Sequence, residues 1–153
     1  MADAGTQLVL FTLDGQRYGL SLTVVERTVR MVAITPLPQA PPVILGVINV
    51  QGTIIPVLDV RSRFCLPLRA PVPGDQLLIA RTVRRTVALA VDTVSGVIDL
   101  PENGAIPPSS ILPAMEYVEG VVKLADGLAF IHDLDQFLSL DEEQALTAAI
   151  ENA

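Results

Sequence analysis

The chain has 153 residues, of which 50 % are hydrophobic and 4 % aromatic, and its formal net charge is −7. This acidic balance and the scarcity of stacking side chains oppose nucleic-acid binding, which needs a basic surface. No apolar run approaches the roughly 18 residues of a membrane-spanning helix, so the hydrophobicity predicts many short strands and no direct membrane insertion. The length predicts one domain.

The cellular compartment is predicted from the N-terminus and the cysteine count. Residues 1–6 contain an acidic residue and lack the basic and apolar stretches of a secretory signal. Cys65 is the only cysteine, which excludes an internal disulfide and a multi-cysteine metal site. Because a free thiol fits a reducing compartment, we expect a cytoplasmic protein. We also expect it to bind no metal and no cofactor.

The first predicted element is a β-hairpin. Residues 8–13 and 18–22 are rich in apolar residues and flank Asp14-Gly15, a pair that tolerates the positive φ of a tight turn. A short segment with spaced apolar residues, 24–29, follows the hairpin. The proline-rich residues 35–42 then predict a stiff, extended connector.

Residues 46–64 predict a second hairpin and the start of a helix. β-Branched residues lie on both sides of Gln51-Gly52, which predicts a turn between two strands. Pro56 cannot donate to a ladder, so we expect its strand at an edge, at a bulge or on the open side of a ladder. Asp59 is well placed to cap a short helix that begins at Val60.

The second half of the chain repeats this design. Strand-forming residues flank the basic turn at Arg84-Arg85, and the proline-rich residues 106–113 hold the position of the first connector. Gly120 and Asp133 are separated by the same number of residues as Gly46 and Asp59.

Two halves, about residues 7–70 and 75–140, are therefore expected to superpose. Roughly 70 residues make one core only marginally stable, so we expect the halves to share a core. The strand residues expected to be mostly buried are Leu20, Leu22, Ile54, Val57, Leu89, Val91, Leu128 and Phe130.

The C-terminal residues predict a helix. Ser139 and Glu142 form the S-x-x-E pattern of a capping box, and the apolar residues that follow recur at helical spacing. This pattern favours a docking helix that closes the core. We expect a single domain at residues 7–146, with residues 1–6 and 147–153 as flexible tails.

Residues with catalytic chemistry are scarce. His132 is the only histidine, and its place at the end of a predicted strand favours a structural role. The sequence contains no G-x-S-x-G elbow, phosphate-binding glycine loop or H-E-x-x-H motif. Asp59 and Asp133 each follow a predicted strand, which favours capping over acid–base chemistry. The sequence thus predicts no enzyme; a small-molecule enzyme and an oligonucleotide-binding barrel are the alternatives.

Several stretches resemble the CheW-like family of chemotaxis coupling proteins. They are residues 25–31, 34–38 and 46–61, with a similar pattern at 91–97 and at Gly120-Val121. The resemblance extends from Leu8 to about Leu146. It implies a mainly β fold of two intertwined, five-stranded, Src-homology-3-like β-barrels with short helices and a C-terminal helix.

The resemblance also implies a function and a set of residues. It implies a non-enzymatic adaptor that bridges the cytoplasmic tip of chemoreceptors to the regulatory domain of a CheA-type histidine kinase. The matching candidates for receptor binding are Val25, Arg27, Val29, Asn49, Gln51, Val94 and Val97, with the valines in a groove between the halves. The structural motif residues are Gly46, Gly52, Pro56, Asp59, Arg61, Gly120 and Asp133.

Two positions depart from the family pattern. The family usually has Asn-Leu-Arg-Gly where this chain has Gln51 in place of the arginine, and Arg27 stands where a glutamate is common. The family's glutamate and arginine resemble a paired polar site, so we expect Arg27 and Gln51 to be neighbours. The double change suggests a divergent coupling protein that serves an array other than the main flagellar one.

Overall fold

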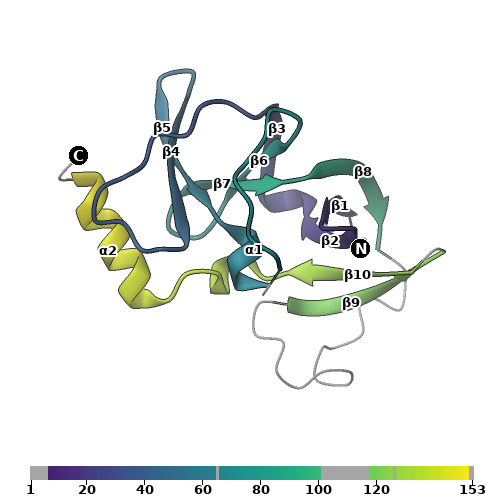
Figure 1. The fold of residues 1–153 in the computed structure, drawn as a ribbon. Coiled ribbons are helices and arrows are strands. Elements are labelled where there is room, and N and C mark those ends of the chain that lie inside the picture. The colour runs from purple at the N-terminus through teal and green to yellow at the C-terminus, as the bar shows by residue number, and fades with distance from the viewer. Residues whose placement is uncertain (1–6, 65, 101–117, 126, 152–153) are drawn as a thin grey trace.

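The computed structural model describes residues 7–64, 66–100, 118–125 and 127–151. These residues form two five-stranded β-sheets, two α-helices and short 3₁₀ turns (Figure 1). The strands are β1 (Gln7–Leu13), β2 (Gln16–Ser21), β3 (Val25–Arg30), β4 (Ile44–Val50), β5 (Thr53–Leu58), β6 (Gln76–Arg81), β7 (Thr86–Val91), β8 (Thr93–Asp99), β9 (Val118–Leu124) and β10 (Gly127–His132). The helices are α1 (Val60–Arg63) and α2 (Leu140–Glu151), and the 3₁₀ turns are η2 (Leu22–Val24) and η4 (Leu134–Gln136). The mainly β fold class is confirmed.

Each sheet combines strands from both halves of the chain. Sheet A has the order β8-β1-β2-β10-β9, and sheet B has the order β3-β6-β7-β5-β4. When β1–β5 are matched in turn with β6–β10, the order of one sheet converts into the order of the other. The halves therefore share one topology but exchange strands, so neither forms a sheet of its own.

Bulges in the strands follow the same duplication. Glu26 and Ser95 are the extra residues where β3 and β8 shift register against their neighbours. Leu45 and Glu119 are the extra residues in the two hairpins β4–β5 and β9–β10. Because bulges fix which strand residues correspond, they align Val25 with Val94, Thr28 with Val97 and Val29 with Ile98 by position.

In the part of the chain that the structure describes, neither sheet closes on itself, which differs from the barrels that the resemblance implies. Among the described residues β8 does not pair with β9, and β3 does not pair with β4. In sheet B the chain after β3 reaches β4 only through a bridge between Thr35 and Val47.

The tight turns have the backbone that their residues predict. Asp14 and Gly15 have φ values of 53° and 83°, and Gln51 and Gly52 have values of 52° and 88°. Two successive residues with positive φ are typical of type I′ hairpin turns. Gly46 has a different role, because a Cβ there would lie 2.3 Å from the carbonyl oxygen of Thr35. Its missing side chain permits the bridge to β4.

Pro56 lies on the open side of a ladder, which was one of its three expected places. β5 pairs with β7 only through Val57 and Leu58, so the part of β5 that contains Pro56 has no partner on that side. β10 pairs with β2 over Ala129 to Ile131 in the corresponding parallel contact. The first residues of both strands therefore extend beyond their parallel neighbours.

The main core combines side chains from both sheets, including Phe11, Leu20, Leu78 and Leu89. Of the eight residues expected to be buried, Leu20, Val57, Leu89 and Val91 are buried, and Leu22 and Phe130 are half-buried. The expectation was wrong for Ile54 and Leu128, which are 56 % and 42 % exposed. These equivalent residues lie near the starts of β5 and β10, outside the parallel pairings that cover those strands.

The helix starts match the expected residues, but the capping chemistry differs between them. α1 begins at Val60, yet the side chains of Asp59 and Asp133 make no capping hydrogen bond.

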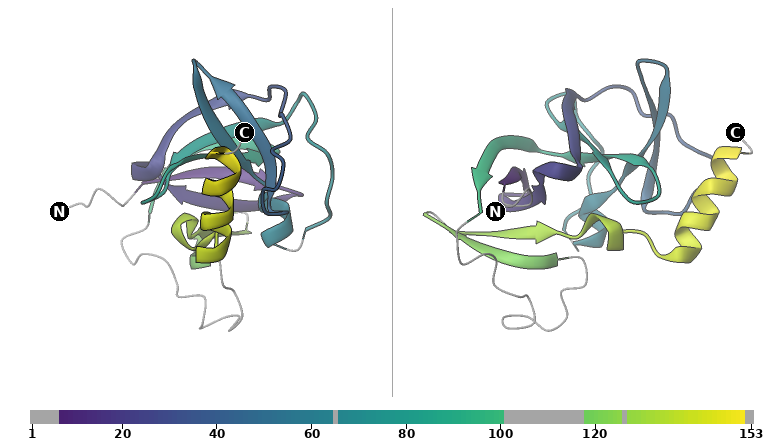
Figure 2. Two further views of the ribbon diagram at one scale, coloured as in Figure 1. Left: turned by 90° about the vertical axis from the view of Figure 1, so that its left-hand side faces the viewer. Right: turned by 180° about the vertical axis from the view of Figure 1, so that it is seen from behind.

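α2 has the predicted capping box and extends further than expected. Ser139 N donates to Glu142 Oε1 (2.9 Å), and Glu142 N donates to Ser139 Oγ (3.1 Å). The helix continues to Glu151 with Ala149 buried, so residues 147–151 are helical and the boundary at residue 146 was set too early. α2 lies beside sheet B, at the end of the molecule away from β8 and β9 (Figures 1 and 2). No described helix is long and apolar enough to cross a membrane.

His132 is a buried core residue. Its ring packs edge-on against Phe64 and Phe137, with centroids 5.2 and 5.4 Å apart, and only 2 % of the residue is exposed. Neither ring nitrogen has a hydrogen-bond partner in the described structure. Burial therefore lowers the pKa of His132 to about 3, and the side chain is neutral at pH 7.

His132 should make the fold less stable in mild acid. The unfolded chain binds a proton near pH 6.5 and the folded chain near pH 3, so this contribution to stability is complete above about pH 6.5 and decreases below it. Between pH 7 and pH 5 the loss is about 2 kcal/mol. His132→Leu should show a smaller difference in unfolding free energy between these pH values, measured by urea denaturation. Equal pH dependence of the unfolding free energy in both proteins would contradict a lowered pKa of His132 in the folded chain.

Candidate protein-binding surface

Arg27 and Gln51 form a polar pair on the surface of sheet B. Arg27 lies on β3, Gln51 lies in the β4–β5 turn, and Arg27 Nη2 donates to Gln51 Oε1 over 3.3 Å. The expectation that the two residues are neighbours is confirmed. Both side chains are exposed, and the neutral amide leaves the charge of the guanidinium uncompensated within the pair. The pair can therefore meet an acidic group of a partner.

Asn49 sets the shape of the turn that carries Gln51. Its side-chain Oδ1 accepts a hydrogen bond from Gly52 N over 2.8 Å, across the tip of the hairpin. This contact is local, and side chains of this type commonly stabilise turns in this way. Asn49 thus holds Gln51 in position through the backbone.

The four candidate valines differ in exposure. Val25 and Val94 are half-buried and pack against the main core, and Val29 packs against a second cluster inside sheet B. Val97 is 51 % exposed. The bulges explain this difference, because Val97 corresponds to Thr28, whereas Val29 corresponds to Ile98, which packs against a third apolar cluster. Val29 and Val97 are therefore not an equivalent pair.

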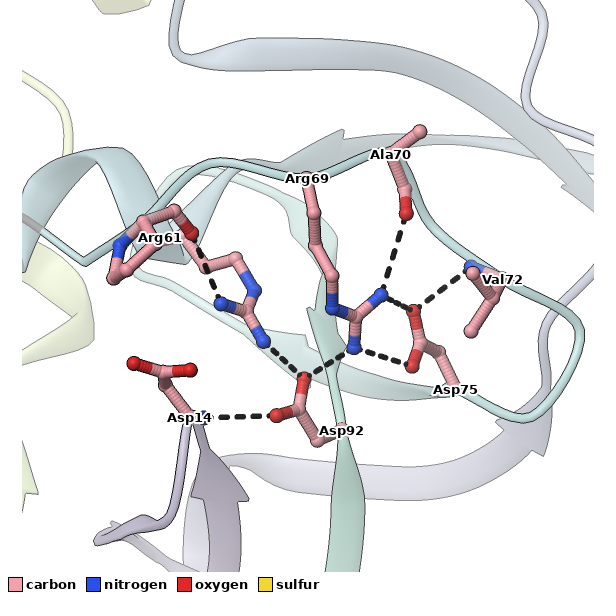
Figure 3. Close-up of polar contacts among 8 residues, drawn as sticks. Asp14, Arg61, Arg69, Ala70, Val72, Asp75 and Asp92 are labelled. Atoms are coloured by element: carbon pink, nitrogen blue, oxygen red, sulfur yellow. Dashed lines mark hydrogen bonds and ion pairs between the residues drawn. The ribbon is translucent and has the colours of Figure 1, made fainter.

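Arg61, the basic member of the structural motif, belongs to a partly buried ionic cluster (Figure 3). Arg61 Nη2 lies 2.6 Å from Asp92 Oδ1, and Arg61 Nη1 donates to the Pro67 carbonyl (3.0 Å). Arg69 donates to both carboxylate oxygens of Asp75 and also to Asp92, each over 2.8 Å.

The contact between Arg69 and Asp75 shifts the pKa values of both residues. The hydrogen bond from Arg69 lowers the pKa of Asp75, and the same bond raises the pKa of Arg69. Sequence reasoning missed Arg69, Asp75 and Asp92, because no local spacing marks residues that meet only in the folded chain.

The remaining motif residues have structural positions. Gly120 is buried on β9 and pairs with Ile131, and Asp133 precedes η4. Among the described residues no group of three or more His, Cys, Asp or Glu side chains is arranged to hold a metal ion.

The fold and this surface define the class of small two-sheet β proteins with exposed polar and apolar groups on strands and a hairpin tip. The CheW-like domain family matches residues 7–142, and the protein belongs to this family. This result confirms the resemblance of residues 25–31 and 46–61.

Individual relatives match nearly the whole chain. The chain is 25 % identical to the chemotaxis protein CheW of Rhizobium meliloti over 147 residues, which cover 95 % of each protein. It is 28 % identical over 144 residues to the chemotaxis protein CheW of Klebsiella aerogenes, covering 93 % of this chain and 86 % of that protein.

A solved structure is similar over the same range. It is the crystal structure of the scaffolding protein TtCheW from Thermoanaerobacter tengcongensis, with a TM-score of 0.81 and 32 % sequence identity. The similarity covers 90 % of this chain and 95 % of that chain.

Charged substitutions should distinguish Val29 from Val97. Val29→Glu places a carboxylate against the apolar cluster of sheet B, so we expect a loss of about 2 kcal/mol or more in unfolding free energy. Val97→Glu adds the same charge at an exposed position and should change the stability by less than about 1 kcal/mol. Thermal and urea denaturation provide the measurement. A collapse of both variants would show that Val97 also belongs to the core.

Proposed function

We propose that this protein is a non-enzymatic adaptor that couples the cytoplasmic tip of chemoreceptors to the regulatory domain of a CheA-type histidine kinase. The observation that carries the proposal is the family match over residues 7–142, together with a TM-score of 0.81 to a protein described as a scaffold. Relatives named as chemotaxis proteins support the signalling context. Both proposed partners lie in the cytoplasm, so we propose the same location for this chain.

The proposed receptor surface contains Arg27 and Gln51, with Val25, Val94 and Val97 as its apolar part. The half-buried or exposed state of these side chains supports this assignment. Val29 is half-buried like Val25 and Val94, and it packs against the second apolar cluster rather than the main core. The pairing of Arg27 with a neutral residue, in place of an acid and a base, supports selection of a divergent receptor.

The kinase proposal is tested by direct binding. We expect the regulatory domain of the CheA-type kinase encoded nearest to this protein to bind with a dissociation constant below about 100 µM, as is typical of modest, reversible interfaces. Isothermal titration calorimetry measures the affinity, and an unrelated β-domain serves as the negative control. Absence of binding at about 100 µM would contradict the adaptor role.

The receptor proposal is tested by a double-mutant cycle at the polar pair. Gln51→Arg places two guanidinium groups side by side and should weaken binding of the receptor tip, because like charges repel. Adding Arg27→Glu creates an ion pair and should restore binding. We expect a favourable coupling of at least about 0.5 kcal/mol between the two substitutions.

Arg30→Glu is the matched control for this cycle. Arg30 is exposed on the same strand and undergoes the same charge change, but its register partner is Gln76 on β6. Adding Arg30→Glu should therefore not restore the receptor binding that Gln51→Arg weakens. Strict additivity at Arg27 and Gln51 would mean that the pair does not act as one site.

A further inference from the structure

The charged cluster around Asp92 connects the two sheets at a point where the chain passes between them (Figure 3). Asp92 lies between β7 of sheet B and β8 of sheet A. Its Oδ1 accepts hydrogen bonds from Arg61 (2.6 Å) and Arg69 (2.8 Å), which lie in α1 and in the segment before β6. Its Oδ2 accepts from the backbone N–H of Asp14 (2.8 Å), in the β1–β2 turn of sheet A. One carboxylate thus joins the β1–β2 turn of sheet A to α1 and to the segment before β6, both of which lie in the connection between strands β5 and β6 of sheet B.

Neighbouring contacts hold this crossover in place. The backbone N–H of Asp92 donates to the Thr12 carbonyl on β1 (3.0 Å), and Val94 N donates to Gln76 Oε1 on β6 (2.7 Å). The two arginines are also anchored, Arg61 by its burial and Arg69 by the bidentate contact to Asp75. Charge-assisted bonds with fixed partners impose a specific geometry.

The described residues form no such cluster at the other crossover, between β2 and β3. The bulge alignment places Thr23 at the position that corresponds to Asp92. The side-chain hydrogen bonds described there are local, between Ser21 Oγ and Thr23 Oγ1 (2.8 Å) and from Thr23 N to Ser21 Oγ (3.4 Å). Among the described residues, long-range charged contacts are therefore concentrated at one of two equivalent connections.

We propose that Asp92, Arg61 and Arg69 are positioning residues that fix the angle between sheet A and sheet B. The consequence for signalling rests on the proposed function, because the candidate pair Arg27–Gln51 lies on sheet B and Val97 lies on sheet A. An adaptor that holds two partners transmits a geometric change only when its own parts keep a defined orientation. In some proteins, buried ionic groups contribute to conformational specificity although they add little to stability.

Distance measurement between the sheets tests the proposal without any partner. Spin labels at Thr53 of β5 and Lys123 of β9 report the separation of the sheets, because both residues are exposed, and Cys65→Ser removes the native thiol. The parent protein should give one narrow distance distribution by pulsed electron paramagnetic resonance. Asp92→Asn keeps the size of the side chain but removes its charge, and it should broaden or shift the distribution.

Glu143→Gln is the matched control. This substitution removes the acid of another partly buried ion pair, between Arg85 and Glu143. That pair connects the β6–β7 turn with α2 and does not join the sheets. Its distance distribution should match the parent. Broadening in this control as well would show that any lost ion pair loosens the fold, and would overturn the assignment to Asp92.

Two further measurements keep the test decisive if Asp92→Asn fails to fold. Asp92→Asn leaves the buried Arg61 without its counter-charge, which can be strongly destabilising. Arg69→Gln removes a side chain that is 37 % exposed and should broaden the distribution to a smaller extent. Salt at about 1 M should act in the same direction on the parent, because it screens the exposed part of the cluster. An unchanged narrow distribution under both conditions overturns the proposal.

The functional part is tested with the kinase domain and the receptor tip. Arg69→Gln should change the affinity for each partner alone by less than about twofold but should reduce receptor control of kinase activity, since the binding faces stay intact. If Arg69→Gln instead lowered the affinity for one partner as much as it lowered receptor control, Arg69 would have a local role at that interface, and the positioning role would be overturned. If the parent binds neither partner, the proposed function fails, while the distance measurement still decides whether Asp92 fixes the sheets.

Discussion

Neither half of this chain can complete a sheet without the other, because each five-stranded sheet takes strands from both. Sheet A places β1 and β2 beside β8, β9 and β10, and sheet B does the reverse. The parallel contacts β2–β10 and β5–β7 join the halves, and the main core combines Phe11 and Leu20 with Leu78 and Leu89. A half of roughly 70 residues would be marginal alone. This exchange of strands makes the two halves one cooperative unit. The connections between the sheets, β2–β3 and β7–β8, are therefore held by a sheet at each end.

Local signals in the sequence were sufficient for the turns and the C-terminal helix. Asp14-Gly15 and Gln51-Gly52 predict positive φ at adjacent residues, and Ser139 with Glu142 predicts a reciprocal cap, since the chemistry is contained within a few residues. Exposure of Ile54 and Leu128 could not be predicted in this way. It depends on where the parallel neighbour of each strand ends, and that neighbour comes from the other half.

The candidate surface also contains some features that could be predicted from the sequence and others that could not. The contact between Arg27 and Gln51 was inferred from the family resemblance, which carries information about tertiary structure that composition and spacing lack. The exposure of Val97 could not be predicted from the apolar pattern, because β3 and β8 carry equivalent bulges and this register matches Val97 with Thr28. Arg61 was named only as a motif residue, and nothing in the sequence indicated that it meets Asp92 and Arg69, since four separate segments bring the cluster together.

The two crossovers give the duplicated fold an asymmetry that its topology lacks. At one connection a carboxylate accepts three hydrogen bonds, from the β1–β2 turn of sheet A, from α1 and from the segment before β6. At the other connection the side-chain contacts described are between neighbours in sequence. Replacing such a cluster by apolar side chains is often neutral or stabilising, so stability alone is a weak reason for its presence. A fixed orientation between two exposed faces is a stronger reason, because apolar contacts are not directional, whereas a carboxylate bound by two anchored guanidinium groups is.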